Sequence, residues 1–244
     1  MRQADAGARL RAALQELETL HQELADFSYS VSHDLRAPLR HIDGFARLLE
    51  AELGAPGGKA GRYLATIGAA ARRMDALLED LLQFSRAARE PLAPQRVEPA
   101  ALVQALIREA AGTIGERRVE WVVDELPAVT ADPALLRTVL RNLLSNALKF
   151  TRAREPARIE IRARRLDGGA VELQVRDNGA GFDMQFAEKL FGVFQRLHDD
   201  EEFEGRGIGL ATARRILHRH GQRIRGEGAP QAGAAFTFTM PAAD

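Results

Sequence analysis

The chain has 244 residues, of which 45% are apolar and 28% are charged, and it contains no cysteine. This composition is typical of a globular protein, and the length suits two modest domains. Lys+Arg and Asp+Glu both total 34, so the net charge gives no reason to expect a nucleic-acid partner. The lack of cysteine excludes disulfides, thiolate catalysis and cysteine-based zinc sites.

No stretch approaches the roughly 20 consecutive apolar residues of a transmembrane helix, and the amino terminus lacks an apolar signal region. We therefore expect a cytoplasmic protein. Because Met1 leads directly into a helical pattern, we also expect an upstream sensory domain to be absent from this chain.

Residues 1–27 predict a coiled-coil helix that continues into the next segment. The seam consists of Leu10, Leu14, Leu17, His21, Leu24, Ser28 and Val31. These residues alternate by four and three positions, as a heptad repeat does. His21 and Ser28 weaken the seam, so a solvent-exposed amphipathic helix is the alternative. We favour a parallel two-stranded coil that leads into a dimer.

Residues 28–90 predict an all-α helical hairpin. Apolar residues at helical spacing run from Val31 to Leu49 and again from Tyr63 to Phe84, and a glycine- and proline-rich turn at 53–58 separates the two stripes. A lone hairpin leaves part of its apolar stripe uncovered. Pairing with a second copy into a four-helix bundle covers it, so we predict a homodimer.

Residues 91–98 predict a linker, because Pro91, Pro94 and Pro99 punctuate a polar stretch. Residues 99–244 predict a separate α+β sandwich, with the helices on one face of a sheet. Its expected helices are 100–111, 133–150, 184–194 and 208–220, and its expected strands are 119–123, 158–164, 171–177, 223–227 and 235–240.

His33 and Asp34 are the first candidate catalytic residues, on the first hairpin helix. A neighbouring carboxylate can accept one imidazole proton while the free ring nitrogen acts as a nucleophile, here toward a phosphoryl group. Most surface histidines are solvated bystanders, so this pair alone is weak evidence.

Asn142, Asn146 and Lys149 share one face of the expected helix 133–150, because they are four and three residues apart. Amide oxygens suit Mg²⁺, and the lysine can neutralise phosphate. A solvated polar face is the alternative, although asparagine is a poor helix former.

Asp177, Gly179 and Gly181 follow an alternating strand. An aspartate there can accept a hydrogen bond from an exocyclic amine such as that of adenine, and the glycines allow close backbone approach. A simple hairpin turn is the alternative interpretation.

Gly205, Gly207, Gly209 and Leu210 form a glycine-rich entry to a helix, where bare N–H groups can hold phosphate. A mobile glycine loop that caps the helix is the alternative. Arg196, between this motif and the previous one, is a further candidate for a phosphate contact.

Taken together and in this order, the motifs resemble those of sensor histidine kinases. Residues 33–38 resemble the H box, 142–151 the N box, 177–181 the G1 box, 191–196 the F box and 205–210 the G2 box, and the resemblance spans roughly residues 20–240. Residues 33–45 also resemble kinases attached to phytochrome or PAS-type sensors. The joint order is far more specific than any single motif.

This resemblance implies a histidine-phosphotransfer hairpin followed by an ATP-binding domain of the Bergerat type, which gyrase and Hsp90 relatives share. It implies ATP as the nucleotide, Mg²⁺ on Asn146, phosphate contacts from Asn142 and Lys149, and adenine selection by Asp177. It also implies transfer from His33 to an aspartate of a response-regulator receiver domain. Ala37 stands where many members carry Thr or Asn, so phosphatase activity stays open.

Two other functions are compatible with parts of the pattern. A Bergerat ATPase or anti-sigma type kinase that modifies another protein would lack the hairpin that carries His33. A dimerising scaffold with a vestigial nucleotide site would not need Asn146, Asp177 and the three glycines of the last motif.

Overall fold

The computed structural model describes residues 31, 34–54, 58–89, 91–195, 197, 203 and 206–243. The chain divides into two compact units between Arg89 and Glu90, and each unit is described here by itself. The predicted coiled coil of residues 1–27 lies outside the described residues, as do His33, Arg196 and Gly205.

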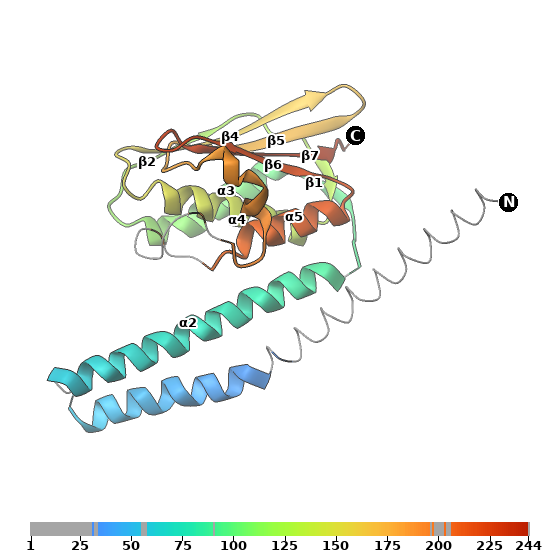
Figure 1. The fold of residues 1–244 in the computed structure, drawn as a ribbon. Coiled ribbons are helices and arrows are strands. Elements are labelled where there is room, and N and C mark those ends of the chain that lie inside the picture. Colours follow the sequence, from blue (N-terminus) through green and yellow to red (C-terminus); the bar gives the residue numbers. More distant parts are fainter. Residues whose placement is uncertain are drawn as a thin grey trace. The chain divides into compact units, whose positions relative to one another are not determined.

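The first unit contains a helical hairpin, as the two apolar stripes predict. Residues 34–52 are helical, and helix α2 spans Gly58–Arg89 (Figure 1). Gly54 and Gly58 flank the turn, and both have a positive φ, of 64° and 73°, which glycine adopts at little cost.

Ion pairs across the hairpin fix the antiparallel register of its helices. Arg36 on the first helix pairs with Glu79 on α2. Nη1 of Arg72 lies 2.7 Å from Oδ1 of Asp43, and this second pair is about two turns closer to the hairpin turn on both helices. Apolar side chains fill the space between the helices, and the buried ones include Leu39, Ala46, Ala71 and Leu82.

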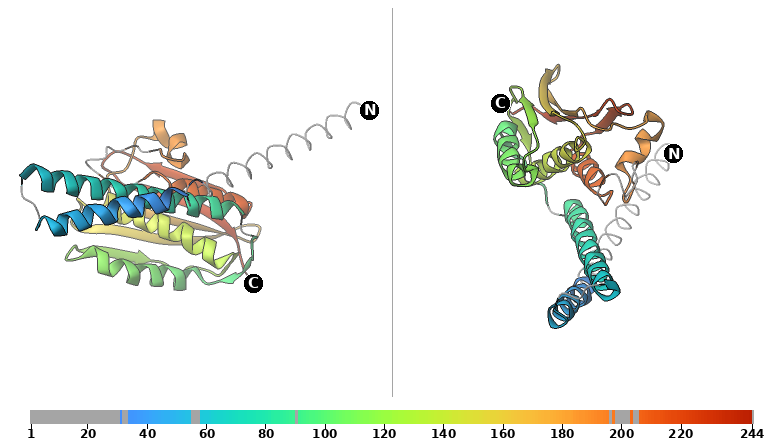
Figure 2. Two further views of the ribbon diagram at one scale, coloured as in Figure 1. Left: turned by 90° about the horizontal axis from the view of Figure 1, so that it is seen from below. Right: turned by 90° about the vertical axis from the view of Figure 1, so that its left-hand side faces the viewer.

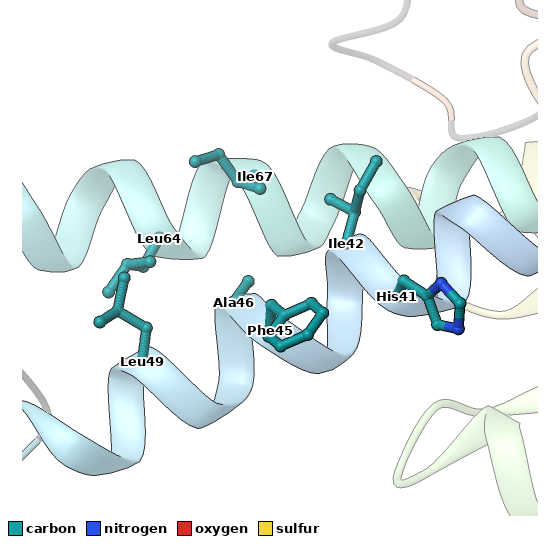
Figure 3. Close-up of a pocket in the computed structure, with 7 residues that line it drawn as sticks. All are labelled: His41, Ile42, Phe45, Ala46, Leu49, Leu64 and Ile67. Atoms are coloured by element: carbon teal, nitrogen blue, oxygen red, sulfur yellow. The ribbon is translucent and has the colours of Figure 1, made fainter.

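One side of the hairpin forms an apolar groove of about 350 Å³. The groove is lined by His41, Ile42, Phe45, Ala46, Leu49, Leu64 and Ile67 (Figure 3). Phe45 is 70% exposed and Ile67 46%, so the apolar stripe is not covered within one copy of the hairpin. This is the uncovered surface on which the prediction of a dimer depends.

The second unit is an α+β sandwich. Its main sheet has the strand order β2-β4-β5-β7-β6, and β2 is parallel to β4 while the other pairs are antiparallel. The strands are β2 (Val119–Val123), β4 (Ala157–Leu166), β5 (Ala170–Asp177), β6 (Ile224–Gly228) and β7 (Ala234–Pro241). Helices α3 (Pro99–Ile114), α4 (Pro133–Phe150) and α5 (Gly209–Arg219) cover one face of this sheet (Figures 1 and 2).

Alternation along the strands separates the core from the solvent. Ile159 and Ile161 of β4 are fully buried, whereas Arg158 and Arg162 on either side of them are exposed. The buried residues of neighbouring strands lie side by side in rows across the sheet, and Val175 of β5, for example, lies opposite Ile161. The core consists of these rows and the apolar faces of α4 and α5, in agreement with a period of two in the strands.

Three features differ from the sequence-based expectation. Strands β1 (Gln95–Val97) and β3 (Val129–Ala131) pair with each other, and neither was predicted, because three residues are too few to show alternation. The expected helix 184–194 is a 3-10 helix, η1 (Met184–Phe191), which is capped by Asp183 and followed by Gly192.

Candidate nucleotide site

Asp177 is a buried carboxylate at the end of strand β5, where it is only 5% exposed. Its Oδ1 accepts a hydrogen bond of 2.8 Å from the backbone N–H of Gly179. Burial raises the pKa of Asp177 from 3.8 to about 6, while backbone hydrogen bonds from Gly179 and Ala234 and the charge of Arg176 act in the opposite direction. A buried carboxylate with an unusual pKa in a glycine loop is a candidate for a functional group.

The loop after Asp177 requires glycine at two positions. A β-carbon on Gly179 would lie 2.6 Å from the carbonyl oxygen of Phe150, and one on Gly181 would lie 1.9 Å from that of Ala229. Gly181 also has a positive φ of 64°. The glycines therefore allow the loop to pack against the end of α4 and against the β6–β7 turn, which a simple exposed hairpin turn would not need.

The carboxyl end of α4 is joined to this loop. The carbonyl oxygen of Phe150, the last residue of α4, accepts a hydrogen bond of 3.0 Å from the N–H of Ala180. Nζ of Lys149 lies 4.0 Å from the centroid of the Phe150 ring, and this ring lies 5.0 Å from the ring of Phe203. The structure thus brings the end of the Asn142–Lys149 face to the loop that carries Gly179 and Gly181.

The polar face of α4 also meets the start of α5. The side chain of Asn142, one of the predicted site residues, lies beside Gly209. A β-carbon on Gly209 would be 3.5 Å from Oδ1 of Asn142. Asn142 and Asn146 are both half-buried, one helical turn apart, and neither is a fully solvated surface residue. Leu210 follows Gly209 in the first turn of α5.

The glycine-rich entry to α5 contacts the segment that follows η1. The N–H of Phe194 donates a hydrogen bond of 3.0 Å to the carbonyl oxygen of Gly207. Gly207 has a φ of 71°, and a β-carbon there would lie 2.6 Å from the carbonyl oxygen of Gln195. Phe194 itself has a φ of 61°, a conformation that a bulky residue seldom adopts, and strain of this kind is common at functional sites.

Helix α4 begins at a cap that sequence reasoning did not single out. Oδ1 of Asp132 accepts hydrogen bonds from the N–H groups of Ala134 and Leu135, and Oδ2 accepts one from Ala93. The N–H of Asp132 donates to Nε2 of His220, which follows α5, at 3.1 Å. The two helices that carry the candidate phosphate contacts are thereby connected at the end away from Phe150.

Arg154 was also missed. Its Nη2 donates to the carbonyl oxygen of Gly179 at 3.1 Å, and to both the carbonyl oxygen and Oε1 of Gln231, at 2.7 and 2.9 Å. These contacts join residues 25 and 77 positions apart in the chain. No local pattern predicts such long-range pairs.

The two candidate residues of the hairpin lie in the other unit. Asp34 is exposed on the first helix, and its neighbour His33 is outside the described residues. Among the residues that the structure describes, no three His, Cys, Asp or Glu side chains are grouped so as to hold a metal ion. No described helix is both long and apolar enough to cross a membrane.

Family models match both parts of the chain. Residues 23–90 match the His Kinase A (phospho-acceptor) domain. Residues 131–244 match the histidine kinase-, DNA gyrase B- and HSP90-like ATPase.

Curated relatives align with almost the whole chain. It is 35% identical to cyanobacterial phytochrome A of Nostoc sp., over 99% of this chain and 31% of that protein. It is 37% identical to the methanogenesis regulatory histidine kinase FilI of Methanothrix harundinacea, over 97% of this chain and 26% of that protein. The chain therefore spans about a third or less of the length of these relatives.

Solved structures share the fold. The crystal structure of full-length ShkA in complex with AMPPNP has a TM-score of 0.67 and 28% identity, over 89% of this chain and 46% of that chain. Histidine kinase ThkA in complex with the response regulator protein TrrA has a TM-score of 0.64 over 94% of this chain and 66% of that chain, but at 22% identity this likeness shows the fold alone.

Proposed function

The chain belongs to the sensor histidine kinase family, and from that premise we propose that it transfers the γ-phosphoryl group of ATP to His33. The phosphoryl group would then pass to an aspartate of a response-regulator receiver domain. One observation carries the proposal: the same chain has a phosphoacceptor-type hairpin and a buried Asp177 at the end of β5, beside glycines that admit a close ligand.

The proposed reaction at His33 is a single displacement. The free ring nitrogen of His33 attacks the γ-phosphorus, the bond from that phosphorus to the β–γ bridging oxygen breaks, and ADP leaves with the electron pair of that bond. Asp34 accepts the proton that the other ring nitrogen releases, so that the imidazole stays neutral. Charge stabilisation and positioning by the nucleotide site supply most of the catalysis in phosphoryl transfer.

The nucleotide would be held by three groups of residues. In the proposed site, the carboxylate of Asp177 accepts a hydrogen bond from the exocyclic amine of adenine, and Gly179 and Gly181 give the base room. Phosphates would contact the polar face of α4 and the glycine-rich entry to α5. Those contacts are assigned to Asn142, Lys149, Arg196, Gly205, Gly207, Gly209 and Leu210.

The residues of α4 suit Mg²⁺ that arrives with the nucleotide. Asn146 offers a neutral amide oxygen, half-buried and one turn from Asn142, and we assign it as the protein ligand. Mg²⁺ usually takes one or two protein oxygens and completes its shell with phosphates and water, so a cluster of carboxylates is not required. When bound, the ion would neutralise charge on the phosphates.

The proposed partners follow from the hairpin. A second copy would cover the exposed apolar stripe that includes Phe45 and Ile67, giving a four-helix bundle. The receiver domain of a response regulator is the proposed acceptor, since ThkA, which shares this fold, has been solved with the regulator TrrA. ATP and such a regulator place the proposed reaction in the cytoplasm, with sensory input from a domain outside this chain.

The proposed domain limits are those of the sequence analysis. They are a coiled-coil signalling helix at 1–27, the phosphotransfer hairpin at 28–90, a linker at 91–98 and the ATP-binding domain at 99–244. Within the linker, residues 95–97 form strand β1 and pair with β3, so this part of it packs with the second unit. The change from one compact unit to the next between Arg89 and Glu90 supports the limit near residue 90.

Phosphorylation of single-histidine variants tests the function. The protein incubated with Mg-ATP should acquire an acid-labile, alkali-stable phosphate that His33→Ala loses. His218→Ala is the matched control, because His218 is an exposed histidine of the second unit and its replacement should leave labelling unchanged. Label that persists in His33→Ala would contradict the assignment, and no label in any variant that still binds ATP would favour the scaffold alternative.

A further inference from the structure

The guanidinium of Arg154 is a clamp between two loops of the second unit. The two hydrogens of Nη2 on this half-buried side chain are shared among three oxygens, the carbonyl of Gly179 and the carbonyl and side-chain oxygens of Gln231. All three acceptors are neutral, so the contacts depend on geometry and on charge-assisted hydrogen bonds, which are about twice as strong as neutral ones. Arg154 thus joins the loop after β5 to the turn between β6 and β7.

The clamp completes the bonding of one peptide group beside Asp177. Arg154 holds the carbonyl of Gly179, and the N–H of Ala180, in the same peptide group, donates to the carbonyl of Phe150 at 3.0 Å. The preceding N–H, that of Gly179, donates to Oδ1 of Asp177 at 2.8 Å. Rotation of the Gly179 carbonyl would therefore disturb the backbone bond that orients the carboxylate.

The backbone of Gln231, on the other side of the clamp, is strained. Gln231 has a φ of 61°, and its N–H donates to the carbonyl of Ala180 at 2.6 Å. A non-glycine residue seldom adopts this conformation, and it persists where the surrounding structure fixes it. The contacts of Arg154 with Gln231 supply that constraint, and the same guanidinium holds the carbonyl of Gly179 on the loop after β5.

We propose that Arg154 is a positioning residue for base recognition, which sets the preference for adenine by fixing the Gly179–Ala180 peptide against Asp177. The inference rests on the proposed function, because it takes Asp177 as the residue that binds adenine. Arg154 need not touch the nucleotide, and its effect reaches the base through the backbone of Gly179.

The test compares Arg154→Gln, Arg154→Lys and Arg152→Gln in the full chain, by calorimetric titration with Mg-ATP and Mg-GTP between pH 5 and 8. Arg154→Gln should bind ATP about tenfold more weakly, about 1.4 kcal/mol, with little change for GTP. Arg154→Lys should recover part of this loss, since it keeps one charged donor. Arg152 is exposed and should behave as wild type when replaced.

A second readout separates positioning from a loss of stability. The hydrogen bond from Gly179 lowers the pKa of Asp177, and Arg176 is the charged group that acts on it. Weakening that bond in Arg154→Gln should move the midpoint of the pH dependence of ATP binding upward from about 6. A purely structural role would lower the melting temperature but leave both this midpoint and the ATP-to-GTP ratio unchanged.

Failure of the inference and failure of the proposed function are distinguishable. If Asp177→Asn keeps the preference for ATP, the adenine assignment itself is wrong. If Asp177→Asn loses that preference while Arg154→Gln keeps it with an unchanged midpoint, only the inference is overturned. Should Arg154→Gln fail to fold, Gln231→Gly removes one acceptor while it permits the positive φ, and it should weaken ATP binding about threefold; wild-type affinity in that variant would overturn the inference.

Discussion

Asn142 and Gly209 bring helix α4 and helix α5 into contact at the candidate phosphate site. A β-carbon on Gly209 would lie 3.5 Å from Oδ1 and 3.6 Å from Cγ of Asn142, which is ordinary van der Waals contact. A methyl group on residue 209 therefore fits against Asn142. We expect a larger side chain at position 209 to displace the side chain of Asn142.

Substitutions at Gly209 should distinguish the effect of side-chain size from the effect of replacing glycine. Gly209→Ala should fold with an unfolding free energy within about 0.5 kcal/mol of wild type, and should bind ATP nearly as well. Gly209→Val adds two methyl groups, one of which must displace Asn142, so we expect ATP affinity to fall about tenfold, or about 1.4 kcal/mol. Calorimetric titration checks both variants, and equal affinities for Ala and Val would contradict the proposed contact of Asn142 with phosphate.

Gly207 should tolerate no side chain at all. Its φ of 71° is unfavourable for other residues, and a β-carbon would lie 2.6 Å from the carbonyl oxygen of Gln195. Gly115→Ala is the matched control, because Gly115 has a φ of 63° but no atom within 4 Å of the β-carbon position. Urea unfolding should show a loss of roughly 1–3 kcal/mol for Gly115→Ala and clearly more for Gly207→Ala. Equal losses would show that the contact with Gln195 is relaxed at no cost.

Periodicity predicted most of the second unit. The boundaries of α4 and β2 agree with the prediction, and those of β4, β5, β6, β7 and α5 differ by one or two residues. The pattern was clear because one face of each element is buried and the other is exposed. Strands β1 and β3 are defined by their mutual pairing rather than by their own pattern, so sequence reasoning could not find them.

The candidate site was predictable only where its residues are close in the chain. Asp177, Gly179 and Gly181 form one loop, and Asn142 and Asn146 are one helical turn apart. Arg154 and His220 act through partners 77 and 88 residues away, and no spacing rule connects such positions. An arginine or a histidine that binds backbone groups leaves no motif in a single sequence.

Asp177→Asn should lose nucleotide binding and gain stability. The folded pKa of about 6 is above the ordinary value of 3.8, so the folded chain holds the proton more tightly than the unfolded chain. Ionisation of Asp177 therefore lowers the free energy of unfolding. The whole of this loss is present above pH 6, and it disappears as the pH falls from 6 toward 4. Each unit of pKa shift corresponds to about 1.4 kcal/mol, so the loss of unfolding free energy is up to about 3 kcal/mol.

The asparagine variant cannot ionise, and its side-chain oxygen can still accept the bond from Gly179. Urea unfolding at pH 7.5 should give a higher unfolding free energy than wild type, and the difference should shrink at pH 5. ATP binding should be lost, since an amide presents the wrong mixture of donor and acceptor. A variant less stable than wild type at pH 7.5 would contradict the cost assigned to burial of the charge.

His220→Ala should weaken the connection between α4 and α5. Nε2 of His220 accepts a bond from the N–H of Asp132, so that nitrogen carries no proton, and Nδ1 donates to the carbonyl of Ile216 at 2.9 Å. Removing the ring leaves the N–H of the buried Asp132 without this acceptor, a loss of about 1–3 kcal/mol. His218→Ala, at an exposed position two residues earlier, should change stability by less than about 0.5 kcal/mol. Similar losses in both variants, measured by urea unfolding, would contradict a specific role for His220.

Phe45→Glu should dissociate the proposed dimer. Phe45 is 70% exposed and lies in the groove with Ile42, Leu49 and Ile67, so in one copy of the hairpin its ring faces solvent. A buried charge without a partner is strongly unfavourable, and a glutamate at this position would have to be desolvated in the bundle. Sedimentation equilibrium should show a dimer for wild type and a dissociation constant at least a hundredfold higher for the variant, about 2.7 kcal/mol.

The control for this variant is Ala51→Glu, which adds the same charge to the same helix. Position 51 is exposed and lies on the opposite side of the helix from Ile42 of the apolar stripe, since nine residues rotate the helix by about 180°. It should leave the dimer intact and helical content unchanged by circular dichroism. Equal dissociation in both variants would indicate a general effect of charge on the helix, and a wild-type dimer in Phe45→Glu would show that another face of the hairpin forms the interface.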